Sequence, residues 1–412
     1  MATRILVIHY TPPGVIGGVE HILHQHIHLL QQRGFRVQIA AGRPGGADVR
    51  AHVIPEIDAA STSNALIEAD LAVGVVDQQF HRARQAILPK LQALAADADF
   101  IIVHNAFTLH FNLPLTAALW ELAATRPSGS VIAWCHDLAW TNPLYAPAMH
   151  DGYPWDLLRS PAPNTKYVTV SRERARELRE IWGRQDSEID VVPNGIDAAT
   201  FMRLSAPTRR LVDQYRLFDR DCVLLLPVRI TRRKNIELGI RAVEALKDGG
   251  LDVCFLISGP TAPHHPGRSR TYLAELQDLR EQLGVRDEVV FLADELGENL
   301  EDQTVAELYA VADALLFPSA HEGFGLPILE AGLARLPAVV TDIPIFAEVG
   351  GDDVWRVDLA ATAETIADRI RTTLNENCAR LYRRILREFR WEVIVDRKII
   401  PLLNAEYSKV AP

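Results

Sequence analysis

ALLFPSAHEGFGLPILEAG, residues 314–332, is an apolar run, a glycine-rich turn and a helical pattern in succession. Two glutamates in it, Glu322 and Glu330, lie eight positions apart. Pro327 between them suits the first turn of a helix, where the N–H that proline lacks would have no partner. The stretch therefore predicts a strand, a loop that holds Glu322, and a helix from about Leu326 that holds Glu330 one turn inside.

The turn in this stretch has the features of an anion site. Gly323 and Gly325 flank Phe324, and glycine lets the backbone approach a ligand closely. Free N–H groups of Gly325 and Leu326, together with the helix dipole, would suit a diphosphate. The alternative interpretation is a strand–turn–helix junction with a capping carboxylate and no ligand.

Short apolar runs alternate with helical patterns along the whole chain. Such near-continuous apolar strands between helices predict a parallel sheet that is covered on both faces. The expected strands lie at residues 4–10, 36–41, 100–105, 130–136, 166–171 and 189–195, and then at 222–229, 252–258, 288–293, 314–319 and 337–341. We therefore expect an α/β protein with two doubly wound domains. These are residues 1–195 and 196–395, with a helix over about 396–412 that packs back on the first domain.

Composition excludes several classes of protein. The 412 residues are 48% hydrophobic and 23% charged, which is ordinary for a folded globular chain. We find no apolar run long enough for a membrane span, and no signal-peptide pattern at the start. The net charge of −10 argues against bulk nucleic-acid binding. Four cysteines without a CxxC pair are typical of a reduced protein, so we expect a cytoplasmic location.

Basic residues follow the first strand of the second domain. The segment PVRITRRKN holds Arg229 and, five residues later, Lys234. Ligands of open α/β sheets bind at the carboxyl ends of the strands, and both side chains suit oxygen anions. Arg232 and Arg233 between them are expected to be solvated. A generic basic turn is the alternative.

Two features of the first domain point toward a ligand. Gly17 and Gly18 follow the first strand and open a helix, but the spacing lacks the G-x-G-x-x-G fingerprint of dinucleotide binding, which weakens a dehydrogenase interpretation. His136 comes at the end of a predicted strand, where an imidazole can hydrogen-bond a substrate. A purely structural histidine is the alternative.

In this order the motifs resemble those of the family-4 retaining glycosyltransferases, whose GT-B fold has two Rossmann-like domains facing a cleft. The resemblance covers nearly the whole chain. It implies transfer of a sugar from a nucleotide-diphosphate donor with retained anomeric configuration, and with no metal and no other cofactor.

The resemblance also implies a role for each motif. Glu330 would bind the donor ribose, and Glu322 would face the hydroxyls of the transferred sugar. Arg229 and Lys234 would hold the phosphates and stabilise the leaving group. His136 would contact the donor sugar or the acceptor. The loop at Gly17 and Gly18 would lie beside the donor phosphates or the acceptor.

Several matters stay open at this point. Both GDP-mannose and UDP-glucose fit as donors, and the acceptor could be a sugar, a lipid or a small molecule, with peripheral membrane contact for a lipid. A nucleotide-sugar-binding protein without turnover, an epimerase and a phosphorylase are the alternatives of the same fold. The aromatic segment 140–155 would be an acceptor lid or a packed loop. We expect a mobile loop over 262–270, with Arg268 or Arg270 near a ligand. The histidines of the first helix are expected to form an exposed or partly buried face, not a metal site.

Overall fold

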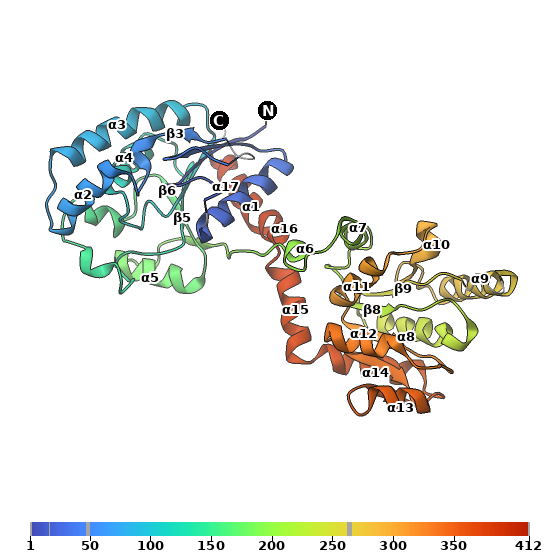
Figure 1. Ribbon diagram of the computed structural model, residues 1–412. Coiled ribbons are helices and arrows are strands. Elements are labelled where there is room, and N and C mark those ends of the chain that lie inside the picture. The colour runs from blue at the N-terminus through green and yellow to red at the C-terminus, as the bar shows by residue number, and fades with distance from the viewer. Residues whose placement is uncertain (1, 16, 47–49, 262–265, 411–412) are drawn as a thin grey trace. The chain divides into compact units, whose positions relative to one another are not determined.

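The computed structural model describes residues 2–15, 17–46, 50–261 and 266–410, with the backbone alone at 266–269 and 406–410 (Figure 1). The chain divides into two compact units. The first is Met1–Ile196 together with Phe389–Pro412, and the second is Asp197–Glu388. The C-terminal segment therefore joins the first unit earlier in the sequence than the expected start near residue 396.

The first unit is built on a seven-stranded parallel sheet in the order β3-β2-β1-β4-β5-β6-β7. The strands are β1 (Arg4–Ile8), β2 (Arg36–Ala41), β3 (His52–Val53), β4 (Phe100–His104), β5 (Val131–Cys135), β6 (Thr165–Thr169) and β7 (Ile189–Val191). The helices are α1 (Gly18–Gln32), α2 (Thr62–Ala72), α3 (Gln78–Ala95), α4 (Leu113–Ala124) and α5 (Arg172–Trp182), with short turns η1 (Pro55–Ile57), η2 (Ala146–Ala148) and η3 (Trp155–Leu158).

The second unit repeats this plan with a six-stranded parallel sheet in the order β10-β9-β8-β11-β12-β13. Its strands are β8 (Cys222–Leu226), β9 (Val253–Ile257), β10 (Val289–Phe291), β11 (Ala314–Phe317), β12 (Ala338–Thr341) and β13 (Trp355–Val357). Its helical segments are α6 (Ala198–Phe201), α7 (Ala206–Gln214), η4 (Arg232–Lys234), α8 (Ile236–Asp248), α9 (Pro266–Gln282), α10 (Leu292–Leu296), α11 (Asp302–Val311), α12 (Leu326–Ala334), α13 (Pro344–Gly350), α14 (Ala363–Leu374) and α15 (Asn377–Glu388).

Alternation along the buried strands explains the layers of the first unit. In β1, Leu6 and Ile8 join a core with α3 and α4, whereas Ile5 and Val7 join a second core with α1 and the C-terminal segment. Successive side chains of a strand point to opposite faces, so a strand that is apolar throughout must be covered on both sides. The predicted fold class, two Rossmann-like parallel-sheet domains, is confirmed.

The chain returns to the first unit through α16 (Trp391–Ile394), the π-helical turn η5 (Val395–Ile399) and α17 (Ile400–Val410). The backbone N–H of Ile196 donates to the carbonyl oxygen of Phe389 at 2.7 Å, which ties this segment to the end of the first unit. Trp391 is buried, and a Cβ at Gly195 would lie 2.5 Å from its ring. The expected helical character of this segment is confirmed.

Two strands, β3 and β13, were not predicted from the sequence, and both are short strands at the edge of a sheet. β3 has two residues and is exposed, so it carries no apolar run. β13 alternates in burial and follows an acidic glycine-rich turn, so it lacks the continuous apolar pattern of its neighbours. Sequence periodicity detects central strands better than edge strands because only the central ones are buried on both faces.

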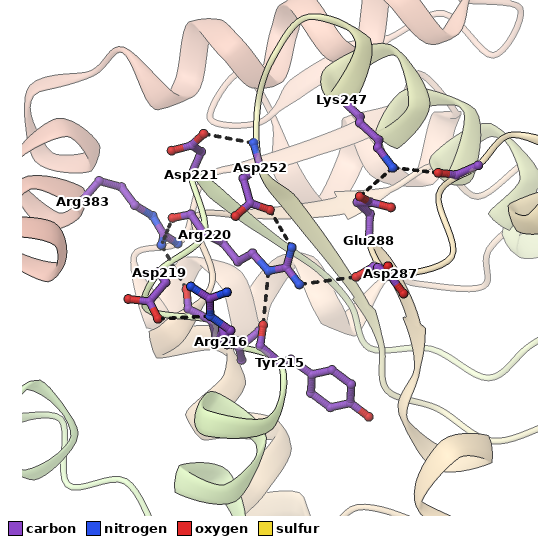
Figure 2. Close-up of polar contacts among 12 residues, drawn as sticks. Tyr215, Arg216, Asp219, Arg220, Asp221, Lys247, Asp252, Asp287, Glu288 and Arg383 are labelled. Atoms are coloured by element: carbon purple, nitrogen blue, oxygen red, sulfur yellow. Dashed lines mark hydrogen bonds and ion pairs between the residues drawn. The ribbon is translucent and has the colours of Figure 1, made fainter.

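Polar contacts fasten the amino end of the second sheet (Figure 2). Arg383 of α15 donates from Nε to Asp313 at 2.7 Å, and Asp313 accepts a bond of 2.6 Å from the backbone N–H of Val223 at the start of β8. Arg220 pairs with Asp252, just before β9. These contacts tie α15 to the amino ends of the strands, opposite the carboxyl ends at which ligands of such sheets bind.

No helix among the described residues is both long enough and apolar enough to cross a lipid bilayer.

Candidate active site

The glycine loop before α12 has the conformation that its sequence predicts. α12 begins at Leu326 with Pro327 in its first turn, and its N-cap is Gly325. Gly325 has φ of 95°, and a Cβ there would lie 3.0 Å from the ring of Phe346. Glycine is therefore required at this position on two grounds. Gly323 and Phe324 are exposed beside it.

Backbone donors at this loop are available to a ligand. Among the described residues, no acceptor is found for the N–H groups of Gly325 and Leu326, which precede the first hydrogen-bonded turn of α12. The first N–H groups of a helix lack intrahelical partners and carry the positive end of its dipole. The loop therefore has the donors that a phosphate requires.

Lys234 and Glu322 form a buried ion pair beside this loop. Lys234 closes the short turn η4 after β8, and its Nζ hydrogen-bonds Oε1 of Glu322. The ammonium also lies 5.1 Å from the centre of the Phe317 ring. Burial lowers the pKa of Lys234 below its usual value, and Glu322 acts in the opposite direction by favouring the ammonium. The sequence named both residues, and the structure brings them together.

Arg233 also belongs to this cluster, contrary to the expectation that it is merely solvated. Its Nη1 lies 3.0 Å from Oε2 of Glu322 and 3.2 Å from the carbonyl oxygen of His321. The carbonyl oxygen of Arg233 accepts a bond of 2.8 Å from the N–H of Ala320, so the two loops are joined. Arg232 instead pairs with Glu275 on the surface.

A cavity of about 770 Å³ opens at the carboxyl ends of β8 and β9. This volume is in the range of small-molecule sites. Arg229 and Glu330 both line it, and Arg229 is exposed with no ion-pair partner among the described residues. The remaining lining residues are mostly small or apolar: Pro227, Val228, Ser258, Gly259, Pro260, Asn299, Leu300, Asp302, Val305, Ala306, Tyr309, Leu333 and Ala334.

Tyr309 orients Glu330 in this cavity. The Tyr309 hydroxyl donates to Oε2 of Glu330 at 2.5 Å, and the tyrosine itself is buried in α11. Burial, followed by the carboxylate beside it, raises the pKa of Tyr309, so the hydroxyl keeps its proton as a donor. One carboxylate oxygen of Glu330 is thereby engaged, and the other can meet a ligand.

In the first unit, Gly17 and Gly18 lie exposed at the start of α1. A Cβ at Gly18 would meet no atom within 4 Å, so nothing within the described chain requires glycine at that position. Glu20 accepts a hydrogen bond from Thr11 and lies 3.7 Å from Nε2 of His9. The interaction with His9 is the main cause that lowers the pKa of Glu20 to about 2.

His136 follows β5 and is buried, with 7% of its surface exposed. Its backbone N–H donates to Oδ1 of Asn105 at 2.8 Å, and its Nε2 lies 3.0 Å from Nδ1 of His104. Burial, with the charge of His9 as a second cause, lowers its pKa to about 3, so the ring is neutral near pH 7. A neutral imidazole donates from one nitrogen and accepts at the other.

Sequence reasoning missed two residues of these clusters, Tyr309 and His104, and it named Arg233 only as a solvated side chain. His104 ends β4 as His136 follows β5, so its position at the end of an apolar run was a usable signal. Tyr309 had no local signal, because its contact with Glu330 spans 21 residues and depends on how α11 packs beside α12.

Other expectations have mixed outcomes. In the aromatic segment, Trp155 is buried and Arg159 covers Trp140 at 4.4 Å, which favours the packed loop over a lid. On the first helix, the histidines were expected to be exposed or partly buried, but His26 is buried. Within the described residues, no group of side chains that could hold a metal ion is found. The expected loop over 262–270 is helical from residue 266. Residues 262–265 and the side chain of Arg268 lie outside the described part.

Comparison with known proteins defines the class to which the chain belongs. Residues 16–200 match the family model for Glycosyltransferase Family 4, and residues 208–388 match the model for glycosyl transferases group 1. The chain therefore belongs to the family-4 glycosyltransferases, as the motifs indicated.

The individual relatives named here share about a quarter of their residues with this chain or fewer. A mannosylglucosylglycerate synthase from Thermotoga maritima is 25% identical over 83% of this chain and 81% of that protein. A glycogen synthase from Mycobacterium tuberculosis is 24% identical over 99% of this chain and 96% of that protein. Among solved structures, a sucrose-phosphate synthase from Thermosynechococcus elongatus is 16% identical over 99% of this chain and 100% of that chain, with a TM-score of 0.41.

Proposed function

We propose that this glycosyltransferase moves a hexose from a nucleotide-diphosphate sugar, of the GDP-mannose or UDP-glucose type, to a hydroxyl acceptor with retention of configuration. The observation that carries the proposal is the cavity lined by Arg229 and Glu330, where Glu330 belongs to α12, the helix whose first N–H groups have no acceptor among the described residues. A nucleoside diphosphate needs a cation, backbone donors and a carboxylate for the ribose, and the cavity together with the start of α12 provides all three. The similarity to a mannosylglucosylglycerate synthase and a glycogen synthase leaves both hexoses open.

In this proposal the second unit holds the donor. Glu330 accepts hydrogen bonds from the ribose hydroxyls, and Arg229 with the N–H groups of Gly325 and Leu326 binds the diphosphate. Lys234 neutralises the charge that develops on the departing phosphate. Such preorganised donors are worth more in the transition state than in the bound substrate.

Retention follows from attack on the same face that the phosphate leaves. Retaining glycosidases use a carboxylate nucleophile. Glu322 suits that role poorly, because Lys234 and Arg233 already bind both of its oxygens. We therefore propose that the departing phosphate accepts the proton of the attacking hydroxyl while the new glycosidic bond forms and the bond from the sugar to phosphate breaks. A glycosyl adduct trapped on Glu322 would contradict this step.

The cation cluster also bears on cofactors. Arg233 and Lys234 contact Glu322 of the glycine loop, and Arg229 lines the cavity, so these side chains can supply the positive charge that a divalent ion supplies in other phosphate sites. We propose that transfer needs no metal and no other cofactor. Activity that survives a chelator is the expected result, and activity restored only by a divalent ion would contradict it.

Turnover of the two donors tests the proposal. The protein is incubated with GDP-mannose or UDP-glucose and a panel of sugar, glycoside and lipid hydroxyl acceptors, and nucleoside diphosphate and product are quantified. We expect diphosphate release that depends on the acceptor, and NMR should show the same anomeric configuration in donor and product. Release that requires inorganic phosphate would indicate a phosphorylase. Donor conversion without an acceptor would indicate an epimerase, and binding without turnover would indicate a sensor.

A further inference from the structure

Four buried histidines gather at the carboxyl edge of the first sheet: His9, His26, His104 and His136. His104 ends β4 and His136 follows β5, the neighbouring strand. Nδ1 of His104 lies 3.0 Å from Nε2 of His136, with the rings 20° from parallel and their centres 5.3 Å apart. One proton must lie between these two nitrogens. The ring that carries this proton determines whether Nδ1 of His136 is a hydrogen-bond donor or an acceptor.

In the part of the chain that the structure describes, no hydrogen bond is found for Nδ1 of His136, so this nitrogen can meet a substrate. Burial lowers the pKa of both rings, that of His104 well below its usual value, so the pair is neutral at pH 7. A neutral imidazole carries one N–H. If His104 donates from Nδ1, the proton of His136 lies on its own Nδ1, and His136 presents a donor. If His136 donates from Nε2, it presents an acceptor.

The surroundings of His104 favour donation from its Nδ1. Within the described residues, no hydrogen bond is found for Nε2 of His104, whereas Nδ1 has Nε2 of His136. Only 1% of His104 is exposed, so an N–H at Nε2 would have no protein acceptor and little contact with water, which is costly. The proton is therefore better placed on Nδ1. The Trp134 ring lies within 24° of parallel to the His104 ring at 5.7 Å, so the ring is packed between Trp134 and His136.

The backbone of His104 is held as firmly as its ring. Its carbonyl oxygen lies 3.2 Å from Nδ1 of His9, and a carbonyl only accepts, so His9 donates. The other nitrogen of His9 faces Glu20. His26 lies against both His104 and Trp134, with ring centres at 5.7 and 4.9 Å. Contacts with His9, His26 and Trp134 therefore hold His104 in place, and with it the His104–His136 pair, without a substrate.

We propose that His104 is a positioning residue that sets the tautomer of His136, so that the Nδ1–H of His136 is the group offered to the substrate. The inference rests on the proposed function, in which a sugar oxygen of donor or acceptor accepts this hydrogen bond. A neutral donor suits this task. The transferred sugar gains positive charge as its bond to phosphate breaks, and an imidazolium would oppose that charge.

Three substitutions at position 104 separate this role from packing. Asparagine places an amide where Nδ1 lies, glutamine places it nearer the position of Nε2, and phenylalanine fills the space with no hydrogen bond. We expect His104→Asn to keep kcat/KM within a few-fold of wild type. We expect His104→Phe and His104→Gln to lose about ten-fold, the size of one hydrogen bond. A packing role predicts the reverse order, with phenylalanine tolerated better than asparagine.

Two further readouts complete the test. The double variant His104→Phe/His136→Ala should be no slower than His136→Ala alone, because the effect of His104 passes through His136. Long-range proton–nitrogen NMR of labelled protein should show His136 with its proton on Nδ1 in wild type and not solely there in His104→Phe. Thermal unfolding confirms that each variant is folded. Independent losses in the double variant, or an Nε2–H tautomer of His136 in wild type, would overturn the inference. The NMR and unfolding results do not require turnover, so a failure of the proposed function would be seen separately.

Discussion

The two ends of the second sheet each hold a buried ion pair, and the two pairs differ in what surrounds them. At the amino end, Arg383 pairs with Asp313 and also donates to the carbonyl oxygens of Leu217 and Arg220 at 3.2 and 2.9 Å. Figure 2 shows Arg383 beside Arg220. Asp313 in turn accepts from the N–H of Val223. Both charged groups are satisfied within the chain.

At the carboxyl end, Lys234 pairs with Glu322, but cationic side chains and backbone N–H groups beside this pair remain accessible to a ligand. Arg233 is half exposed, Arg229 lines an open cavity, and the N–H groups that begin α12 have no acceptor in the described chain. A satisfied pair contributes to one folded geometry, whereas an unsatisfied cluster is completed by a ligand. The same sheet therefore has one closed end, whose charges are satisfied within the chain, and one open end that we propose binds the donor.

Breaking the closed pair should give the largest effect on stability. Asp313→Ala leaves Arg383 buried without its partner, so the free energy of unfolding should fall by about 3–5 kcal/mol. Urea unfolding at neutral pH measures the change. Activity per folded molecule should be unchanged. An equal loss in Asp313→Leu/Arg383→Met, which leaves no buried charge, would show that the uncompensated arginine is not the cause.

Breaking the open pair should instead affect the rate. Lys234→Met removes the cation that we assign to the leaving phosphate, and kcat/KM should fall by about 10²–10³-fold. The melting temperature should fall less than in Asp313→Ala, because Arg233 still pairs with Glu322. Arg232→Met is the matched control, because that arginine lies two residues away in an exposed pair with Glu275 and should cost less than about 1 kcal/mol in either readout. Equal losses of activity in the two variants would remove the distinction between the two ends.

Glu330 should affect affinity more than rate. Glu330→Gln weakens the hydrogen bonds to the ribose, so the affinity for the nucleoside diphosphate should fall by about ten- to a hundred-fold, equivalent to about 1.5–3 kcal/mol. Isothermal titration calorimetry measures it. A 2′-deoxy analogue should lose less between wild type and variant, since part of the contact is already absent. The same loss for both ligands would assign Glu330 elsewhere.

The alkaline limb of the pH profile should report on Lys234. Its pKa lies below the usual value because it is buried, and the ammonium is the active form, so kcat/KM should fall as pH rises through that lowered pKa. Glu322 raises the pKa toward its usual value. Glu322→Gln should therefore move the alkaline limb to lower pH. A limb that stays in place would mean that another group controls it.

The central strands, the α12 turn and the order of the motifs could be predicted from sequence because each depends on local pattern. Pro327 and the glycines define the start of α12, and apolar runs define β8 and β11. Contacts between elements could not be predicted in the same way. Arg233 was predicted to be solvated because its partner Glu322 is 89 residues away in the sequence. The contact of His104 with His136 depends on the pairing of β4 with β5, which the sequence does not show.

The central claim is that the open end binds a nucleoside diphosphate. Calorimetric titration of wild type and Arg229→Gln with GDP, UDP and ADP, and with guanosine and uridine, tests it most directly. We predict that GDP or UDP binds at least about a hundred-fold more tightly than its nucleoside, because the phosphates meet charge-assisted donors, and that Arg229→Gln reduces this difference. Binding of no diphosphate, or equal binding of nucleoside and diphosphate, would contradict the account.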